Sequence, residues 1–159
     1  MSKLKIGCLI IIICLIAVIV HNFVFNNFDS DIYLTSSKSS VDINYLGHEK
    51  NISDGTSFDF SGFNGIWSLI TFDSTKGNKI TIDNNSKINK GKFYVMVLDS
   101  DHNPIIIDKS NKKKLEFTTP KKGKYIIRIA GKNASGAFQM KINSSSKIAI
   151  SHYDMFSAE

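Results

Sequence analysis

The fold is decided by residues 121–142, which read KKGKYIIRIAGKNASGAFQMKI. From residue 138 to residue 142 (FQMKI), apolar and polar side chains alternate. Successive side chains of a strand point to opposite faces, so this alternation predicts a β-strand with one buried and one solvent-exposed face. We expect two strands in this stretch, 124–130 and 136–142, joined by a turn at GKNASG.

The same short-range pattern recurs along the chain on both sides of this stretch. No window after residue 30 shows the 3.6-residue stripe of an amphipathic helix. Residues that favour turns fall between the apolar runs, at 74–78, 99–104, 120–123 and 131–136. The predicted strands are 41–46, 66–72, 79–83, 92–99, 104–108, 114–118, 124–130, 136–142 and 147–151. Such closely spaced short strands are typical of an all-β fold, and we expect an antiparallel two-sheet β-sandwich, jelly-roll-like in form.

One predicted strand is apolar on both faces. Phe93 begins a run in which Tyr94, Met96 and Leu98 face away from the side chains between them. Something must cover this second face. One interpretation is that the segment 58–67, expected to be a loop, folds over it; the other is that Tyr94, Met96 and Leu98 form a surface for a partner or ligand.

The first apolar segment is suited to a membrane. Residues 6–20 read IGCLIIIICLIAVIV, and Lys3 and Lys5 precede them. An apolar helix of about twenty residues crosses a bilayer core, and positive charge marks its cytoplasmic end. We expect a retained single-pass anchor, a transmembrane helix that leaves the rest of the chain extracytoplasmic.

Two other fates compete with the anchor: cleavage as a secretory signal and lipidation as a lipoprotein. Signal peptidase needs small residues just before its cleavage position, and residues 21–28 (HNFVFNNF) lack such a pair. A lipoprotein needs a cysteine at the end of the apolar run, but Cys8 and Cys14 lie inside it. The resulting division is an anchor over 1–25, a linker over 26–40, a β-sandwich domain over 41–151 and a tail over 152–159.

Composition argues against several functions. The formal net charge is +6, and Arg128 is the single arginine among 20 basic residues. Bidentate recognition of phosphates and base edges favours arginine, so we expect no nucleic-acid partner. Both cysteines lie in the apolar segment, so the domain is expected to fold without disulfides.

Few residue patterns point to chemistry. Asp99, Asp101 and Asn103 resemble the start of a calcium loop, but Pro104 stands where that loop needs glycine. The histidines His21, His48, His102 and His152 are scattered, without the spacing of a zinc helix. We expect no metal, no cofactor and no catalytic residues.

Trp67 allows two interpretations. With Phe63 and Phe72 it would form a flat platform on which a sugar ring stacks. A single tryptophan inside IWSLITF (66–72) is also typical of a core strand. The candidate binding residues are therefore Trp67, Tyr94, Met96 and Leu98.

Three stretches carry a resemblance to known proteins. These are WSLITFDSTKGNKITI (67–82), GKFYVMVLDSDHNPIII (91–107) and KKGKYIIRIAGKNASGAFQMKI (121–142). Together they resemble small secreted or lipid-anchored β-sandwich proteins of Gram-positive bacteria. The resemblance covers about half of the chain and implies a fold and a compartment, but no functional residue.

The functional expectation is accordingly broad. We expect a membrane-anchored, non-enzymatic module on the outer side of the cell membrane that binds an envelope protein or polysaccharide. The alternatives are a cell-envelope enzyme with a cryptic site and a purely structural surface protein.

Overall fold

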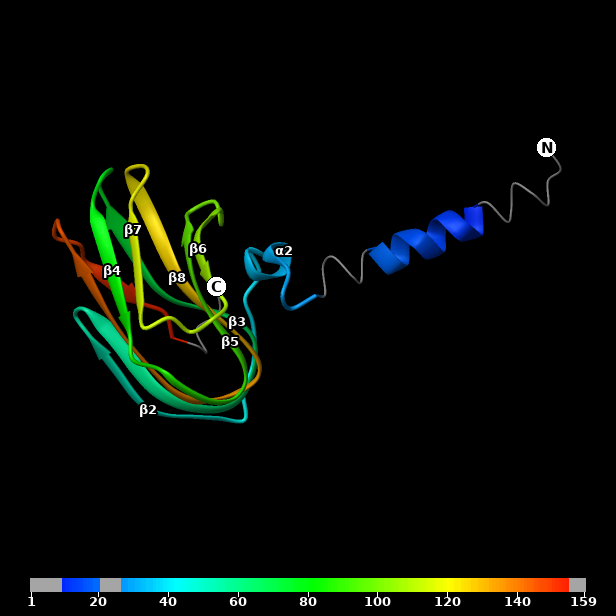
Figure 1. Cartoon of the computed structure of the whole chain (residues 1–159), viewed down its shortest axis with the longest axis horizontal. Helices are drawn as coiled ribbons and strands as arrows, with labels where there is room; N and C mark the ends of the chain where they lie inside the picture. The colour runs from blue at the N-terminus through cyan, green and yellow to red at the C-terminus, as the bar shows by residue number, and fades with distance from the viewer. Residues whose placement is uncertain (1–9, 21–26, 155–159) are drawn as a thin grey trace. The chain divides into compact units, whose positions relative to one another are not determined.

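The chain divides into two units, Met1–Ser36 and Ser37–Glu159. The computed structural model describes residues 10–20 and 27–154 (Figure 1). Within those ranges of the first unit, residues 10–20 and α2 (Asp31–Leu34) are helical. The hydroxyl of Ser30 caps α2 by accepting a hydrogen bond from the backbone N–H of Tyr33, at 3.2 Å.

Residues 10–20 form an apolar helical segment whose large side chains are exposed on all sides, from Ile10 (55% exposed) to Val20 (52%). In the part of the chain that the structure describes, no helix has the length and apolar character needed to cross a membrane. The predicted anchor over 1–25 extends across 1–9 and 21–25, which lie outside the described residues. The anchor therefore stays a prediction.

The second unit is built from antiparallel strands, which confirms the all-β antiparallel prediction. Its strands are β1 (Ser40–Asp42), β2 (Tyr45–Ile52), β3 (Gly55–Ser74), β4 (Lys79–Asn84), β5 (Lys87–Asp99), β6 (Pro104–Asp108), β7 (Lys114–Thr118), β8 (Gly123–Ser144) and β9 (Ile150–His152). The predicted ranges 104–108 and 114–118 match β6 and β7.

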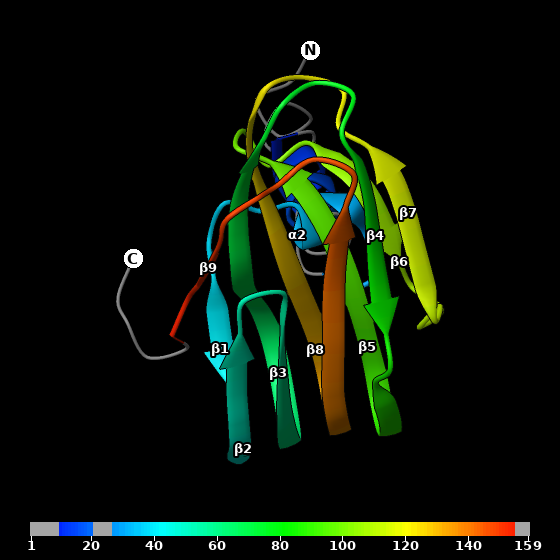
Figure 2. The ribbon, with the colours of Figure 1, turned by 90° about the vertical axis from the view of Figure 1, so that its left-hand side faces the viewer.

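The long strand β8 is the centre of the sheet (Figure 2). One edge of β8 pairs with β3 along nearly its whole length. Its other edge pairs first with β5 and then, near its end, with β4. β6 extends the sheet beyond β5, and β7 extends it beyond β4. The far edge of β3 carries β2, β1 and β9 in turn, so β3 holds the edge where the candidate site lies.

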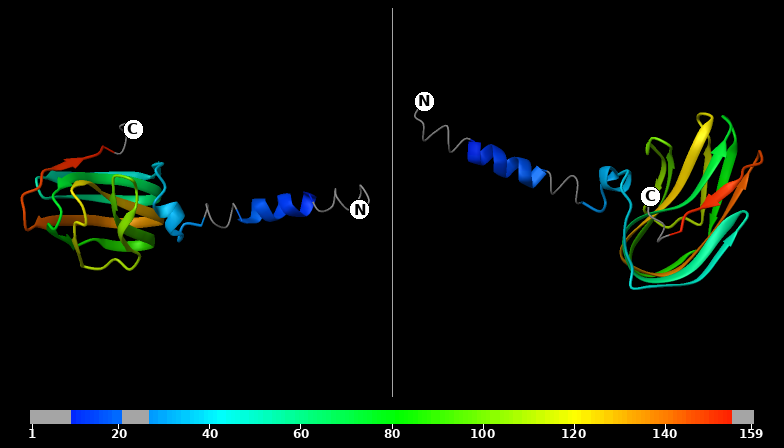
Figure 3. Two further views of the ribbon diagram at one scale, coloured as in Figure 1. Left: turned by 90° about the horizontal axis from the view of Figure 1, so that it is seen from above. Right: turned by 180° about the vertical axis from the view of Figure 1, so that it is seen from behind.

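The sheet curls until its two halves face each other across the core (Figures 1 and 3). Phe58 and Trp67 both belong to β3 and are nine residues apart, which is about 30 Å along a straight strand. Their ring centroids are nevertheless only 5.4 Å apart. β3 therefore bends back on itself, and one strand contributes to both walls of the core.

Bulges and glycines produce this bend. The pairing of β3 with β8 shifts register between Phe60 and Gly65, and β5 shifts against β8 between Ile88 and Lys92. A bulge bends its strand and increases the local twist. Gly65 (φ +109°) and Gly91 (φ +79°) adopt conformations that side chains with a Cβ rarely tolerate. A Cβ on Gly65 would also collide with the carbonyl oxygen of Ser40 in the neighbouring strand.

The curl corrects two predictions. All nine strands of the described residues are joined by hydrogen bonds into one sheet, not two separate sheets. The segment 131–136, predicted as a turn, lies inside β8, and 58–67, predicted as a loop, lies inside β3. The glycines in these segments bend continuous strands instead of ending them. The predicted turns 74–78, 99–104 and 120–123 do connect successive strands.

Candidate functional site

The acidic turn after β5 is held by its own hydrogen bonds. One carboxylate oxygen of Asp99 accepts from the backbone N–H groups of Asp101 and Asn103, each at 2.9 Å. The ammonium group of Lys121 lies 2.9 Å from the other oxygen. The ammonium group of Lys121 thus occupies the position beside Asp99 where a calcium loop would hold its ion. Within the described residues, no group of three or more acidic, histidine or cysteine side chains is arranged to hold a metal ion.

The Asp99 carboxyl also has a strongly perturbed pKa. Burial raises this pKa, but the hydrogen bonds from Lys121, Asn103 and Asp101 lower it by more, and the result is a pKa of about 2 against an ordinary 3.8. A carboxyl whose pKa is lower in the folded chain stabilises the fold above its unfolded pKa, and this stabilisation is lost as the pH falls through the folded pKa.

Replacing Asp99 should therefore change how stability depends on pH. We expect Asp99→Asn to lower the free energy of unfolding by about 1 to 2 kcal/mol at pH 7, since Lys121 is half exposed and solvent screens the ion pair. Urea titrations should also show less loss of stability between pH 4 and pH 2 than in the unmodified chain. Asp101→Asn, at an exposed partner of the same lysine, is the control and should change little. If stability depended on pH in the same way in Asp99→Asn and in the unmodified chain, the lowered pKa of Asp99 would be contradicted.

The second apolar face of β5 is not an exposed surface. Tyr94 is 7% exposed, and Met96 and Leu98 are 0% exposed. The interpretation of these three residues as an open partner surface is therefore wrong. The alternative cover is also wrong, because segment 58–67 is a core strand in its own right.

Trp67 belongs to the hydrophobic core. It is 6% exposed, and its ring lies against Phe58. The two other rings of the proposed platform lie elsewhere: Phe63 contacts Phe60 and Phe93, and Phe72 stacks with Tyr125. The three rings therefore do not form a flat sugar platform, and the core interpretation of Trp67 is confirmed.

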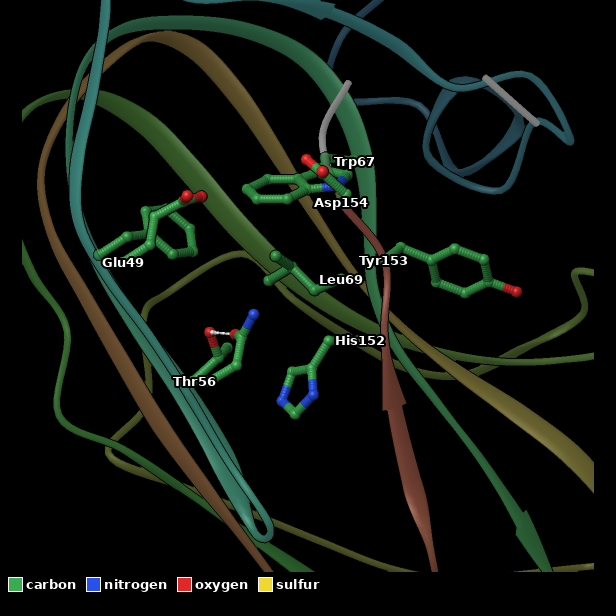
Figure 4. Close-up of a pocket in the computed structure, with 9 residues that line it drawn as sticks. Glu49, Thr56, Trp67, Leu69, His152, Tyr153 and Asp154 are labelled. Carbon is green, nitrogen blue, oxygen red and sulfur yellow. Dashed lines mark hydrogen bonds between the residues drawn. The ribbon is translucent and has the colours of Figure 1, made fainter. Parts of the chain in front are cut away.

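Trp67 nevertheless lines a pocket at the curled edge of the sheet (Figure 4). The cavity has a volume of about 250 Å³. One wall comes from the hairpin of β2 and β3, and the other comes from the second half of β3 together with β9. The lining residues are Glu49, Asn51, Thr56, Phe58, Trp67, Leu69, His152, Tyr153 and Asp154.

Two hydrogen bonds hold the walls of this pocket. The ring nitrogen Nε2 of His152 lies 2.9 Å from the carbonyl oxygen of Gly55, which joins β9 to the start of β3. A carbonyl can only accept, so Nε2 carries the proton of this hydrogen bond. The backbone N–H of Tyr153 donates to the carbonyl of Leu69 at 2.9 Å and continues the β9 pairing.

The pocket presents both donors and acceptors. Glu49 and Asp154 supply carboxylates at its exposed margin. The hydroxyl of Thr56 donates to the side-chain oxygen of Asn51 at 2.7 Å, which leaves the Asn51 amide nitrogen as a donor. The indole nitrogen of Trp67 is the one buried side-chain nitrogen or oxygen, among the described residues, that finds no hydrogen-bond partner.

This combination suits a neutral ligand rich in hydroxyl groups. A hydroxyl group can donate to a carboxylate and accept from an amide or an indole N–H. Apolar surface from Phe58 and Leu69 lies beside these polar groups, as in most pockets for small ligands.

Most of this site was missed by sequence analysis. Trp67 was singled out for a different reason, and Glu49, Thr56 and His152 were not proposed as binding residues. The pocket residues come from β2 and β3 and from β9, about 100 residues later in the chain. These segments meet only because β9 pairs with β3. Neither segment carries a local motif, so no sequence signal was available to find them.

Comparisons with known proteins give little further guidance. No family model and no curated protein sequence matches this chain. A solved structure of a glycosylation-associated protein complex (Gap123) from Streptococcus agalactiae is similar to 70% of the chain, at 13% identity and a TM-score of 0.40. The chain covers 46% of that protein, which is less than half of its length.

A second solved structure contains accessory secretory proteins 1, 2 and 3 of Streptococcus pneumoniae. It is similar to 70% of the chain and 99% of the matched protein, at 8% identity and a TM-score of 0.37. Both neighbours are proteins of Gram-positive bacteria, and the likeness to them is loose. At these scores the likeness carries no inference about function.

Proposed function

We propose that this chain is a membrane-tethered, non-enzymatic module whose β domain binds a polysaccharide of the cell envelope. The observation that carries the proposal is the pocket beside Trp67, which combines two carboxylates, neutral donors and an apolar wall. A polysaccharide offers hydroxyl groups that match the polar groups and carbon-bound hydrogens that match the apolar wall. A cavity of about 250 Å³ is of the order of one sugar unit.

The tether is supported by the first unit. Its helical residues 10–20 are apolar and exposed on every side, with Ile13 57% exposed and Ile19 65% exposed. In water such a surface is unfavourable, whereas in lipid it is the surface required. Lys3 and Lys5 before this segment favour an orientation with the β domain outside the cytoplasm.

The proposal is tested by sedimentation with insoluble envelope polysaccharide. Full-length protein in mild detergent should sediment with the polysaccharide, and Glu49→Gln should weaken the interaction about tenfold, because a hydrogen bond to a charged group contributes about 1.5 to 3 kcal/mol. Glu116→Gln is the matched control, since Glu116 is an exposed carboxylate of β7 outside the pocket, paired with Lys114 at 2.6 Å. Protein that stays in the supernatant, or an equal loss in both variants, would contradict the proposal.

The pocket also suggests a second candidate, a glycoside hydrolase. Two carboxylates at one sugar-sized cavity are the groups that such enzymes use, one as acid and one as nucleophile or base. The same incubation distinguishes the candidates. A binding module leaves the polysaccharide intact, whereas a hydrolase releases new reducing ends that disappear in Glu49→Gln.

A further inference from the structure

The indole nitrogen of Trp67 is unusual among the polar groups of this domain. Its N–H is shielded from solvent and has no hydrogen-bond partner. A buried donor without an acceptor is costly, and native proteins contain few of them. Trp67 lines the pocket (Figure 4), so a bound group that supplies an acceptor would remove this cost.

The surroundings of the indole restrict the chemistry of that acceptor. The rings of Trp67 and Phe58 lie 5.4 Å apart, and Leu69 lines the same cavity. A hydroxyl group would satisfy the N–H but has no apolar part of its own to contact the wall beside the indole. A free amino group would suit the carboxylates of Glu49 and Asp154, but an ammonium group cannot accept a hydrogen bond.

We infer that the pocket recognises the acetamido group of an N-acetylated amino sugar within the polysaccharide. The carbonyl oxygen of this group accepts from the Trp67 N–H, and its methyl group contacts Phe58 and Leu69. Its amide N–H donates to a carboxylate at the margin of the pocket. The inference rests on the proposed function, since it names the chemical group that the same pocket selects.

Binding requires a small adjustment of the pocket. Because the indole nitrogen is shielded from solvent, neighbouring side chains must give way before the acceptor reaches it. Tyr153 and Asp154 line the pocket, are exposed and follow the short strand β9. An exposed side chain can be displaced at a lower cost than a buried one.

The experiment is a titration followed on the indole N–H resonance by NMR. Trp67 is the single tryptophan in the chain, so full-length protein in detergent micelles gives one indole signal. The probes are three β-1,4-linked tetramers, of N-acetylglucosamine, of glucose and of glucosamine, which differ at one substituent of each ring. The acetylated tetramer should move the indole proton downfield in a saturable way and should bind about tenfold more tightly than the glucose tetramer.

Three results would overturn the inference. If the glucose tetramer produces the same shift and affinity, the acetamido group is not selected, although the proposed function stands. If the glucosamine tetramer binds most tightly, charge decides recognition and the indole does not. If no tetramer moves the resonance, both the inference and the polysaccharide function at this pocket fail.

A variant gives a second readout. Trp67→Phe keeps an aromatic ring but removes the N–H, and it should reduce the affinity for the acetylated tetramer to about that for the glucose tetramer, measured by calorimetry. Unchanged discrimination in a folded Trp67→Phe variant would overturn the inference. Should this variant fail to fold, the comparison of the three tetramers on the unmodified chain still decides.

Discussion

Phe138→Ala should lower the free energy of unfolding of the β domain by about 3 to 5 kcal/mol. Phe138 is 1% exposed and lies on the central strand β8. Its ring centroid is 5.1 Å from that of Phe58 on β3 and 5.6 Å from that of Phe93 on β5. Truncation removes contacts to both neighbouring strands and leaves a cavity where the two walls of the curled sheet meet.

A loss of this size is a large fraction of the stability of a typical domain, which is about 5 to 15 kcal/mol. Urea unfolding of the full chain in mild detergent, followed by the fluorescence of Trp67, measures it. The control is Gln139→Ala, whose side chain is exposed at the next position of the same strand. A loss below about 1 kcal/mol for Phe138→Ala would mean that the ring is not central to the core.

Ile13→Arg should release the protein from membranes. Ile13 lies in the helical residues 10–20 and is 57% exposed. An arginine at the centre of a membrane helix costs about 2.5 to 3.5 kcal/mol of insertion free energy, so the ratio of membrane-bound to released protein should fall by about a hundredfold.

The measurement is quantitative immunoblotting of membranes washed with carbonate. Ser39→Arg is the matched control, because it adds the same charge within the predicted linker and should leave the protein in the membrane fraction. Full retention of Ile13→Arg would contradict the tether. A mature protein that begins beyond Phe25 would contradict it as well, because the apolar segment would then have been removed.

The strands were predictable from sequence wherever one face of the strand is exposed to solvent. β6 and β7 lie near sheet edges and are bounded by turns rich in aspartate, asparagine, proline and lysine, so their limits could be read directly. The long strands could not be recognised as continuous. A glycine within an apolar run signals either a turn or a bend, and local sequence does not distinguish the two.

The neighbourhood of Gly131 illustrates this limit. A Cβ at this position would collide with the ring of Phe63 on β3, so glycine is required by a contact between strands 68 residues apart in sequence. Its neighbours in GKNASG nevertheless have the composition of a hairpin turn. The same reasoning explains why the pocket was missed, because its walls meet through the pairing of β3 with β9.

The most direct test of a polysaccharide pocket beside Trp67 is the emission of that tryptophan in the full-length protein as envelope polysaccharide is added. Trp67 is the single tryptophan of the chain and lines the pocket, so occupancy should change its emission wavelength or intensity in a saturable way. The midpoint of this change should coincide with the midpoint of binding measured by sedimentation. Polysaccharide that binds without any change in emission would place the binding site elsewhere and contradict a pocket beside Trp67.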